Sequence, residues 1–319
     1  MKAWMRVLEV SLTSRLGENR KTKQLVFGRN WEDGRDDLNI EVSCYKYMSS
    51  LKDVATIRIS NLTYYEVVQI IQGKFYDVEI KAGYRSSGAQ TIFSGGVLYI
   101  SNSLDDNKTN TITILCASHL VAKFGQSRLN LTLNSGINTY SALRFILGRA
   151  GLPESHMNVS TQFKSQFLQD VVSVNDTAAS WIDKFCSSNT NAITNSDSVT
   201  NSFVSLFDSN RSNARVIKLN SDTINLTGGY PQLTSDGLSL TVMPTFAFMC
   251  SDVIEIDNSV IQIPVSSNSE VMKNYGYFLD KDGHYMIYEM KYQLQNRGSS
   301  FSLQMTCKTR SLISNFIGT

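Results

Sequence analysis

Residues 109–117, TNTITILCA, and residues 301–307, FSLQMTC, decide the fold class of this 319-residue chain. In both stretches apolar side chains alternate with polar ones, which is the period of a β-strand with one buried face. Shifting the C-terminal hairpin back by 191 residues places Leu303, Met305 and Cys307 on Ile112, Ile114 and Cys116. The same shift places Tyr288 and Met290 on Val97 and Tyr99. We therefore expect two similar hairpins and a duplicated β-domain.

The rest of the N-terminal third is also mostly period two. Strands are predicted at 24–28, 38–47, 54–60, 75–82, 91–101 and 109–117, together with one that buries Leu8, Val10 and Leu12. One helix is expected at 63–71, capped by Asn61 or Thr63, with an apolar face of Tyr64, Val67, Val68 and Ile71. This block is predicted to be a β-domain with one helix.

The middle of the chain changes period. A helix is expected after Asn138 or Thr139, with Ala142, Leu143, Ile146, Leu147 and Ala150 on one stripe, and a second after Asp176 or Thr177, with Ala178, Trp181, Ile182 and Phe185. The polar run 187–202 is predicted to be an exposed loop or hairpin tip. Strands at 203–207 and 215–219 are expected to close this block as a hairpin around residues 208–210.

The last hundred residues return to period two, with strands predicted at 238–242, 252–257, 260–264, 285–294 and 301–307. The predicted fold class is α+β, mainly β, with two similar β-domains and a small α+β module between them. The expected boundaries are 1–118 for the first β-domain, 119–213 for the module and 214–319 for the second β-domain.

Composition excludes several classes of protein. Hydrophobic residues make up 42% and charged residues 18%, which is far from the composition of disordered chains. Thirty Lys and Arg against 28 Asp and Glu leave a net charge of +2, so there is no bulk electrostatic footprint for nucleic acid or anionic membrane. Arg6 and Glu9 interrupt the first apolar stretch, and no later run is long enough to cross a membrane, so neither a secretory signal nor a membrane anchor is expected.

The sequence predicts no catalytic, cofactor or metal site. Five cysteines without a CxxC pair are expected to be buried reduced thiols: Cys44, Cys116, Cys186, Cys250 and Cys307. The three histidines, His119, His156 and His284, form no metal-binding motif. Residues 280–283, DKDG, begin like a calcium loop but lack the later ligand spacing, so a turn is favoured; 83–88 is expected to be a hairpin loop rather than a nucleophile elbow.

Two weaker features leave alternatives open. Glu154 and Asp170 could in principle form a glycosidase pair, although nothing singles them out among 28 acids. Several tyrosines could line a sugar groove, but on alternating strands they more often form core and cross-strand pairs: Tyr45, Tyr47, Tyr99, Tyr285, Tyr288 and Tyr292.

Three segments carry a family resemblance. Residues 61–63, NLT, followed by GKFYDVEIKAGY at 73–84 and IFSGGV at 92–97, resemble the N-terminal domain of phage baseplate hub proteins. TGGYP at 227–231, DGL at 236–238 and LTVMP at 240–244 resemble the same family's entry into its second β-domain. YEMKY at 288–292, with RG at 297–298 and the 301–307 strand, resembles its closing hairpin.

The resemblance implies a non-enzymatic, trimeric hub. In such hubs two related barrel-like tube domains per chain, here 1–118 and 214–319, make a pseudo-sixfold ring that adapts a hexameric tail tube to a trimeric spike. Because DNA must pass such a ring without sticking, we expect the channel wall to be polar and neutral or acidic. The implied partners are two further copies of the chain, a tail tube or distal tube-adaptor protein and a separate spike, with tape-measure and baseplate wedge proteins beyond them. The spike is expected to be separate because the chain ends soon after the closing hairpin. Assembly would take place in the host cytoplasm, and the location would be the virion tail baseplate.

Two alternatives from other classes remain at this point. One is a tail-associated peptidoglycan hydrolase, which turnover of labelled peptidoglycan would reveal. The other is a free carbohydrate-binding module. Stoichiometric association with tube and spike proteins would favour the hub.

Overall fold

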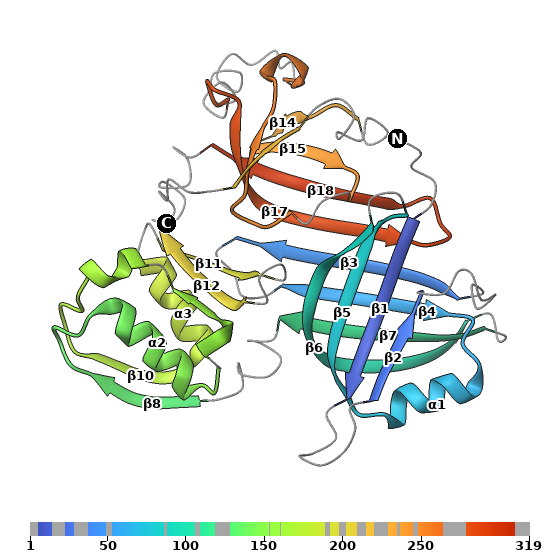
Figure 1. The fold of residues 1–319 in the computed structure, drawn as a ribbon, viewed down its shortest axis with the longest axis horizontal. Coiled ribbons are helices and arrows are strands. Elements are labelled where there is room, and N and C mark those ends of the chain that lie inside the picture. The colour runs from blue at the N-terminus through green and yellow to red at the C-terminus, as the bar shows by residue number, and fades with distance from the viewer. Residues whose placement is uncertain are drawn as a thin grey trace.

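One large sheet dominates this protein (Figure 1). The structure is a computed structural model and describes residues 6–14, 23–28, 38–48, 53–85, 88–105, 109–118, 128–152, 154–159, 161–188, 192–197, 202–208, 215–219, 229–234, 237–244, 248–263 and 279–309. In these residues the chain is mainly β, as predicted, with 13 strands in the large sheet and two small sheets beside it.

The first part of the large sheet is built before residue 119. Its strands are β1 (Arg6–Ser14), β2 (Lys23–Phe27), β3 (Asn39–Tyr47), β4 (Val54–Ser60), β5 (Phe75–Tyr84), β6 (Gly88–Asp105) and β7 (Thr109–Ser118). They pair in the order β3-β4-β7-β6-β5-β1-β2. The strand predictions for this region are confirmed, and β6 is longer than expected.

The second part comes from the end of the chain. Its strands are β13 (Val216–Lys218), β14 (Gln232–Thr234), β15 (Gly237–Val242), β16 (Val253–Glu255), β17 (His284–Gln295) and β18 (Phe301–Lys308). The order is β14-β15-β18-β17, with β16 on β17 and β13 on β16. The two parts join where Glu289–Gln295 of β17 pairs antiparallel with Glu41–Tyr47 of β3. One apolar core is continuous beneath both parts.

The two predicted hairpins have the same register and the same irregularity. In β6–β7, Val97 faces Cys116 and Tyr99 faces Leu115, so Leu98 is an extra, bulged residue. In β17–β18, Ile287 faces Cys307 and Glu289 faces Thr306, so Tyr288 is bulged. The shared β-bulge corrects the sequence alignment. Strand β17 matches β6 at an offset of 190 residues, so that Tyr288 corresponds to Leu98, whereas β18 matches β7 at the predicted offset of 191.

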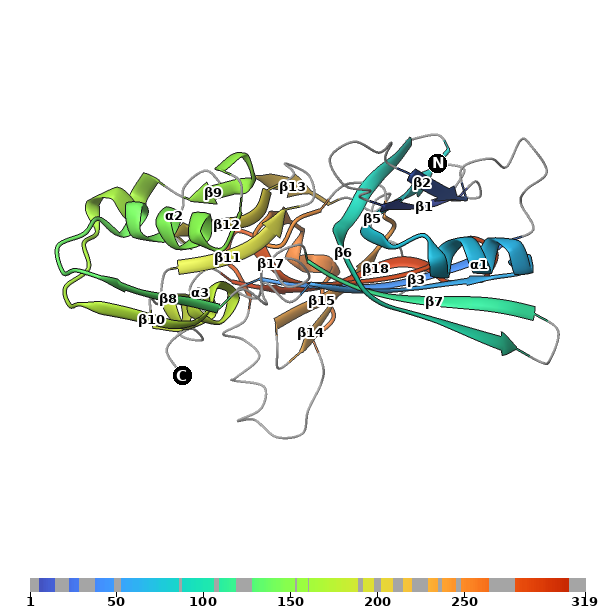
Figure 2. The ribbon, with the colours of Figure 1, turned by 90° about the horizontal axis from the view of Figure 1, so that it is seen from below.

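Strand β6 passes between two layers of the molecule. Its first half pairs with β5 and its second half with β7, so β5, β1 and β2 fold over one face of the sheet (Figure 2). The crossing falls at Gly95, where an added Cβ would lie 2.2 Å from the Ala117 carbonyl oxygen. The strand therefore needs a residue without a side chain at this position.

Helix α1 (Tyr64–Gln72) forms between β4 and β5 with a capping box. The Glu66 N–H donates to Thr63 Oγ1 (3.3 Å), and the Thr63 N–H donates to Glu66 Oε2 (2.8 Å). The predicted apolar face is wrong in part, since Val67 and Ile70 are buried whereas Tyr64 is 77% exposed and Ile71 is 52% exposed. A nine-residue helix that bridges two strands buries one narrow stripe, and the strand connections set its rotation.

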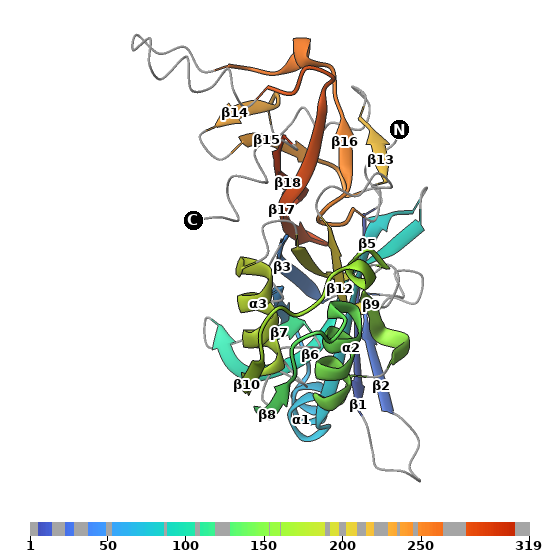
Figure 3. The ribbon, with the colours of Figure 1, turned by 90° about the vertical axis from the view of Figure 1, so that its left-hand side faces the viewer.

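The middle of the chain forms a small α+β unit beside the sheet (Figures 1 and 2), and Figure 3 looks at this unit with the sheet behind it. It contains β8 (Arg128–Leu133), α2 (Thr139–Arg149), β9 (Met157–Val159), β10 (Val172–Thr177), α3 (Ala178–Ser188), β11 (Ala192–Asp197) and β12 (Ser202–Asp208), with short 3-10 turns at Glu154–His156 and Thr161–Ser165. Asn138 caps α2, whose predicted apolar stripe is buried. The predicted second helix is confirmed as α3, and Ser180 N–H donates to Thr177 Oγ1 at its start. The sequence did not predict β8, β9 or β10.

The strands predicted at 203–207 and 215–219 form as β12 and β13, but the hairpin predicted between them is wrong. Strand β12 pairs with β11, inside the run predicted to be a loop or hairpin tip, and with β9, while β13 joins the large sheet beside β16. The expected hairpin between them does not form because each strand has a better-placed partner elsewhere. The strand predicted at 260–264 is also wrong for the described residues 260–263. Val260 ends a 3-10 turn (Asn258–Val260) in which Asp257 Oδ1 accepts the Ser259 N–H at 2.8 Å, and Gln262 makes only an isolated bridge to Gln232. Among the described helices, none combines the length and the apolar character needed to cross a bilayer.

Candidate functional site: the polar face of the large sheet

The face of the sheet opposite β1, β2 and β5 is polar. Its side chains come from β15, β18, β17, β3, β4, β7 and β6, where every second residue points away from the core. The strand registers place them in four rows, which we call the polar face: Ser239, Thr306, Glu289 and Tyr47; Thr241, Gln304, Lys291 and Tyr45; Ser302, Gln293, Ser43, Thr56, Leu115 and Tyr99; Gln295, Glu41, Arg58, Thr113 and Ser101.

The charges on this face are balanced. Within the four rows, Glu41 and Glu289 are acidic, and Arg58 and Lys291 are basic. Glu41 and Arg58 lie directly opposite each other on β3 and β4. Such a surface is well hydrated but offers no cluster of unpaired cations to a phosphate backbone.

The polar face crosses the junction between the two parts of the chain. Gln293 Nε2 donates to Ser43 Oγ (2.8 Å), and Gln295 Nε2 donates to Glu41 Oε1 (3.3 Å). The Lys291 ammonium lies 5.3 Å from the Tyr45 ring centroid. Burial and the neighbouring Glu289 carboxylate raise the pKa of the Tyr47 hydroxyl. The junction therefore continues the same surface without a break.

The opposite face is apolar and contains the thiols. Cys44, Cys116, Cys250 and Cys307 are buried thiols, as predicted; the side chain of Cys186 lies outside the described part. Burial raises the pKa of the Cys44 thiol to about 12 and the pKa values of the other three thiols as well. Thiols held in this protonated form are poor nucleophiles and metal ligands.

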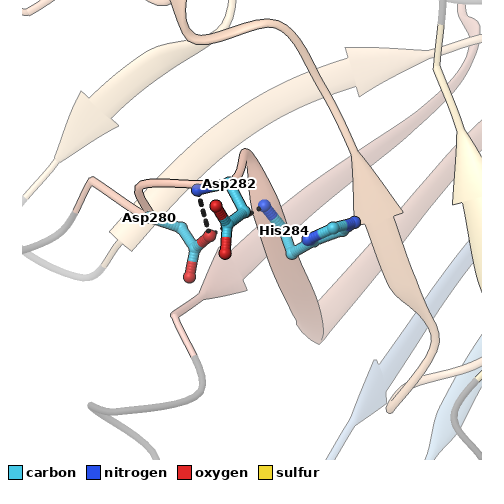
Figure 4. Close-up of side chains that lie close together, drawn as sticks. All are labelled: Asp280, Asp282 and His284. Atoms are coloured by element: carbon cyan, nitrogen blue, oxygen red, sulfur yellow. Dashed lines mark hydrogen bonds between the residues drawn. The ribbon is translucent and has the colours of Figure 1, made fainter.

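Asp280, Asp282 and His284 come together at the start of β17 (Figure 4). Each offers one ligand atom, and these atoms lie within 4.8 Å of one another. Asp280 Oδ1 accepts the backbone N–H groups of Asp282 (3.0 Å) and His284 (3.1 Å), and Gly283 has a positive φ of 70°. These contacts are those of a tight turn, which is the structure predicted for this segment. The sequence did not predict that His284 would join the two carboxylates.

The other residues considered as sites are found in separate places. The Glu154 side chain is 75% exposed and pairs with Arg144, and Asp170 is exposed just before β10. Neither carboxyl has the apolar burial that a glycosidase general acid requires. The segment 83–88 connects the antiparallel strands β5 and β6, whose pairing continues to Tyr84 and Gly88, as expected for a hairpin; residues 86–87 lie outside the described part. His119 lies outside the described residues, as does the side chain of His156.

The tyrosines do not share a groove. Tyr285 and Tyr292 are fully buried in the core, Tyr45 and Tyr47 lie on the polar face, and Tyr99 is 63% exposed. Tyr288 packs partly against the core, with the Lys308 ammonium 3.8 Å from its ring centroid. The core and cross-strand interpretation is supported for these side chains.

The polar face was not predicted as a unit. Alternating Ser, Thr and Gln on single strands was visible in the sequence, for example around Gln304. Sequence alternation gives the two faces of one strand but not the identity of its neighbours. The pairing of β17 with β3, about 250 residues apart, assembles the surface.

Comparison with solved structures places this fold among tail proteins. A 43 kDa tail protein of prophage MuSo2 from Shewanella oneidensis matches with a TM-score of 0.55 and 8% identity, over 96% of this chain and 97% of that one. A tail protein from Neisseria meningitidis matches with a TM-score of 0.56 and 7% identity, over 99% and 100%. No protein-family model and no curated protein matches the sequence.

The same fold occurs in type VI secretion. An E. coli component of that system, described as similar to the T4 bacteriophage tail proteins gp27 and gp5, matches with a TM-score of 0.54 and 10% identity, over 85% of this chain and 73% of that one. A Francisella PdpA–VgrG complex contains a chain that matches with a TM-score of 0.55 and 9% identity, over 97% of this chain and 58% of that one. The chain therefore has the fold of two phage tail proteins, of a type VI secretion component and of a chain in the PdpA–VgrG complex.

Proposed function

We propose that the chain is the structural hub of a phage tail baseplate. Three copies would form a pseudo-sixfold ring that adapts a hexameric tail tube to a trimeric spike and leaves a channel for DNA. Similarity over nearly the whole length of two tail proteins supports the structural role, and the duplicated hairpin supports two ring units per chain. The ring units would be residues 1–118 and 214–319, with 119–213 as an added module.

The main support for a channel is the polar face of the large sheet. If the sheet closes into a ring, one face must line the lumen, and the apolar face is already occupied by the core beneath β1, β2 and β5. The face that remains is the polar face, with two acidic and two basic residues per copy. DNA would pass such a wall without tight, salt-dependent binding.

The proposed partners are a tail tube or tube-adaptor protein on one side and a separate spike on the other, with tape-measure and wedge proteins as further contacts. The proposed location is the virion tail. The proposed role is non-enzymatic, which the exposure of the Glu154 and Asp170 carboxylates supports.

Two measurements test the proposal together. Native mass spectrometry of the purified chain should give a trimer, and that trimer should not retain duplex DNA at physiological salt. Glu41→Lys combined with Glu289→Lys should create retention that falls steeply as salt rises, because it turns a balanced wall basic.

A matched control places the same charge change elsewhere. Glu154→Lys combined with Asp170→Lys alters exposed positions in the middle module and should leave DNA retention as low as in the parent protein. A chain that stays monomeric at all concentrations, or a parent trimer that binds DNA tightly, would overturn the non-adhesive ring.

A further inference from the structure

We infer that the open edge of β6, residues Leu98–Leu104, is the strand to which a second copy of this chain attaches. The inference rests on the proposed ring and names the surfaces that close it. The occupant is the β14 end of the large sheet, where β14 and the Gln262 segment form the edge of the other copy.

The pairing of β17 with β3 inside one chain shows how such a strand edge can be covered. Strand β17 pairs with β18 on one side, and on the other side its residues Glu289–Gln295 are covered by β3 in seven residue pairs. The bulged residues Leu98 of β6 and Tyr288 of β17 occupy the same position in the two hairpins. Tyr99–Asp105 of β6 therefore corresponds to Glu289–Gln295 of β17. Within the described parts of the chain, no strand pairs with this stretch of β6 on the side away from β7, because the pairing with β5 ends at Gly96.

The exposed side chains agree with a missing partner. Leu98 is 47% exposed, Tyr99 is 63% exposed and Leu104 is 55% exposed. A long, uncharged edge of this kind is an aggregation hazard in a protein that remains a monomer. The corresponding residues of β17 are partly or fully buried, with Tyr292 at 0% in the position that corresponds to Asn102.

The hydrogen bonds of β17 show which residues of β6 direct their backbone N–H and C=O groups toward the open edge. The Asn296 N–H donates to the Ile40 carbonyl (3.1 Å), and the Met48 N–H donates to the Tyr288 carbonyl (2.7 Å), so even-numbered residues of β17 direct their polar groups at β3. The same phase directs the N–H groups of Ile100, Asn102 and Leu104 outward from β6. These groups are the donors available to a second copy.

The complementary edge lies at the β14 end of the strand order; the opposite end of that order is β2, and β6 is open only along its second half. Strand β14 ends the path, and Gln262 lies along it, since the Leu233 N–H donates to the Gln262 carbonyl (3.0 Å) and the Gln262 N–H donates to the Pro231 carbonyl (2.7 Å). Tyr230 and Ile263, 54% and 42% exposed, lie beside this edge. Figure 1 shows β14 and β6 far apart in the sheet, so one copy cannot join them itself.

A joint of this type is heterologous, because the two surfaces differ. Heterologous joints form closed rings when the rotation allows it. One joint is already made inside each chain by β17 and β3, and a second between β6 and the β14 edge would alternate with it around the ring.

The test removes one outward donor. Asn102→Pro deletes an N–H that faces the open edge, a position where proline is tolerated in an isolated edge strand. The trimer fraction in native mass spectrometry should fall more than about tenfold, since every joint loses a backbone hydrogen bond and its close fit. Asn102→Ala keeps the N–H and should assemble like the parent protein.

A cross-linking experiment decides the matter if the proline variant fails to fold by circular dichroism. Asn102→Cys combined with Gln262→Cys, treated with a short thiol cross-linker, should give a covalent trimer on a denaturing gel, and neither single variant should do so. Two outcomes would overturn the assignment of this edge and leave the hub proposal intact, provided that the parent protein is a trimer. One is the absence of a cross-link in the double cysteine variant, and the other is full assembly of a folded Asn102→Pro variant. A parent protein that never forms a trimer would overturn the ring itself.

Discussion

The hairpins β6–β7 and β17–β18 share a register and a bulge, yet their surroundings differ. The outer edge of β17 is covered by β3, and Tyr292 there is fully buried. The corresponding edge of β6 is open in the described structure, and its counterpart Asn102 is exposed. The same backbone pattern therefore forms an internal joint in β17 and an open edge in β6. The side chains differ accordingly, since the joint has a buried aromatic residue where the open edge has an exposed polar one.

The largest expected effect is a loss of stability on replacing Tyr292, the buried residue of the pair Tyr292 and Asn102. Tyr292→Ala should lower the free energy of unfolding by about 3–5 kcal/mol, because it opens a cavity beneath the β17–β3 joint. Asn102→Ala at the corresponding exposed position should change it by less than about 0.5 kcal/mol in the monomer. Urea unfolding of both variants under dissociating conditions checks this pair, and equal effects would contradict the assigned equivalence.

The second prediction concerns the position at which the two hairpins differ most. Gly95 corresponds to the buried Tyr285, and a Cβ at Gly95 would meet the Ala117 carbonyl oxygen at 2.2 Å. Gly95→Ala should therefore cost about 1–3 kcal/mol of stability.

Gly148 in α2 is the matched control for this substitution. The nearest atom to a Cβ there is Met157 Cε at 4.0 Å, so Gly148→Ala should stabilise the protein by about 0.5–1 kcal/mol through helix propensity. Thermal melting measures both, and a neutral Gly95→Ala would show that β6 does not need a glycine to change layers.

A smaller effect sharpens the description of the joint. The Tyr292 hydroxyl is buried without a hydrogen-bond partner among the described residues, and burial raises its pKa well above the usual range. Tyr292→Phe should be neutral or stabilising by up to about 1 kcal/mol. A clear loss of stability in equilibrium unfolding would mean that the hydroxyl has a partner.

The smallest expected effect is a pH dependence at the outer strands. The parallel pair β13–β16 carries the Lys218–Glu255 ion pair (2.9 Å), and the pKa of Glu255 is lowered chiefly by its hydrogen bond with Lys218. A lowered carboxyl pKa gives stability that is present above its ordinary value and is lost as the pH falls through the folded-state value.

Hydrogen exchange measures this loss. Corrected for intrinsic rates, the amides of β13 should lose protection on acidification before those of β1, which is held by a long antiparallel pairing with β5. Glu255→Gln should remove the pH dependence at β13. Equal loss at both strands would contradict the role of the pair.

Local features of this protein were determined by the sequence itself. Alternation fixed most strands, Thr63 and Asn138 fixed two helix starts, and Asp280 with Gly283 fixed a turn, because each depends on contacts within a few residues. Apolar alternation also predicted that Cys116 and Cys307 would face the core. The likeness of the two hairpins was detectable because both retain the same inward pattern on their second strands.

The tertiary structure alone decided which strands are neighbours. The partners of β12 and β13, the rotation of α1 and the joint between β17 and β3 depend on contacts between distant segments, which a local pattern does not encode. The bulges at Leu98 and Tyr288 likewise became evident only from the pairing registers. The polar face is assembled by those same long-range pairings, because a strand has two faces of its own but gains a surface only from its neighbours.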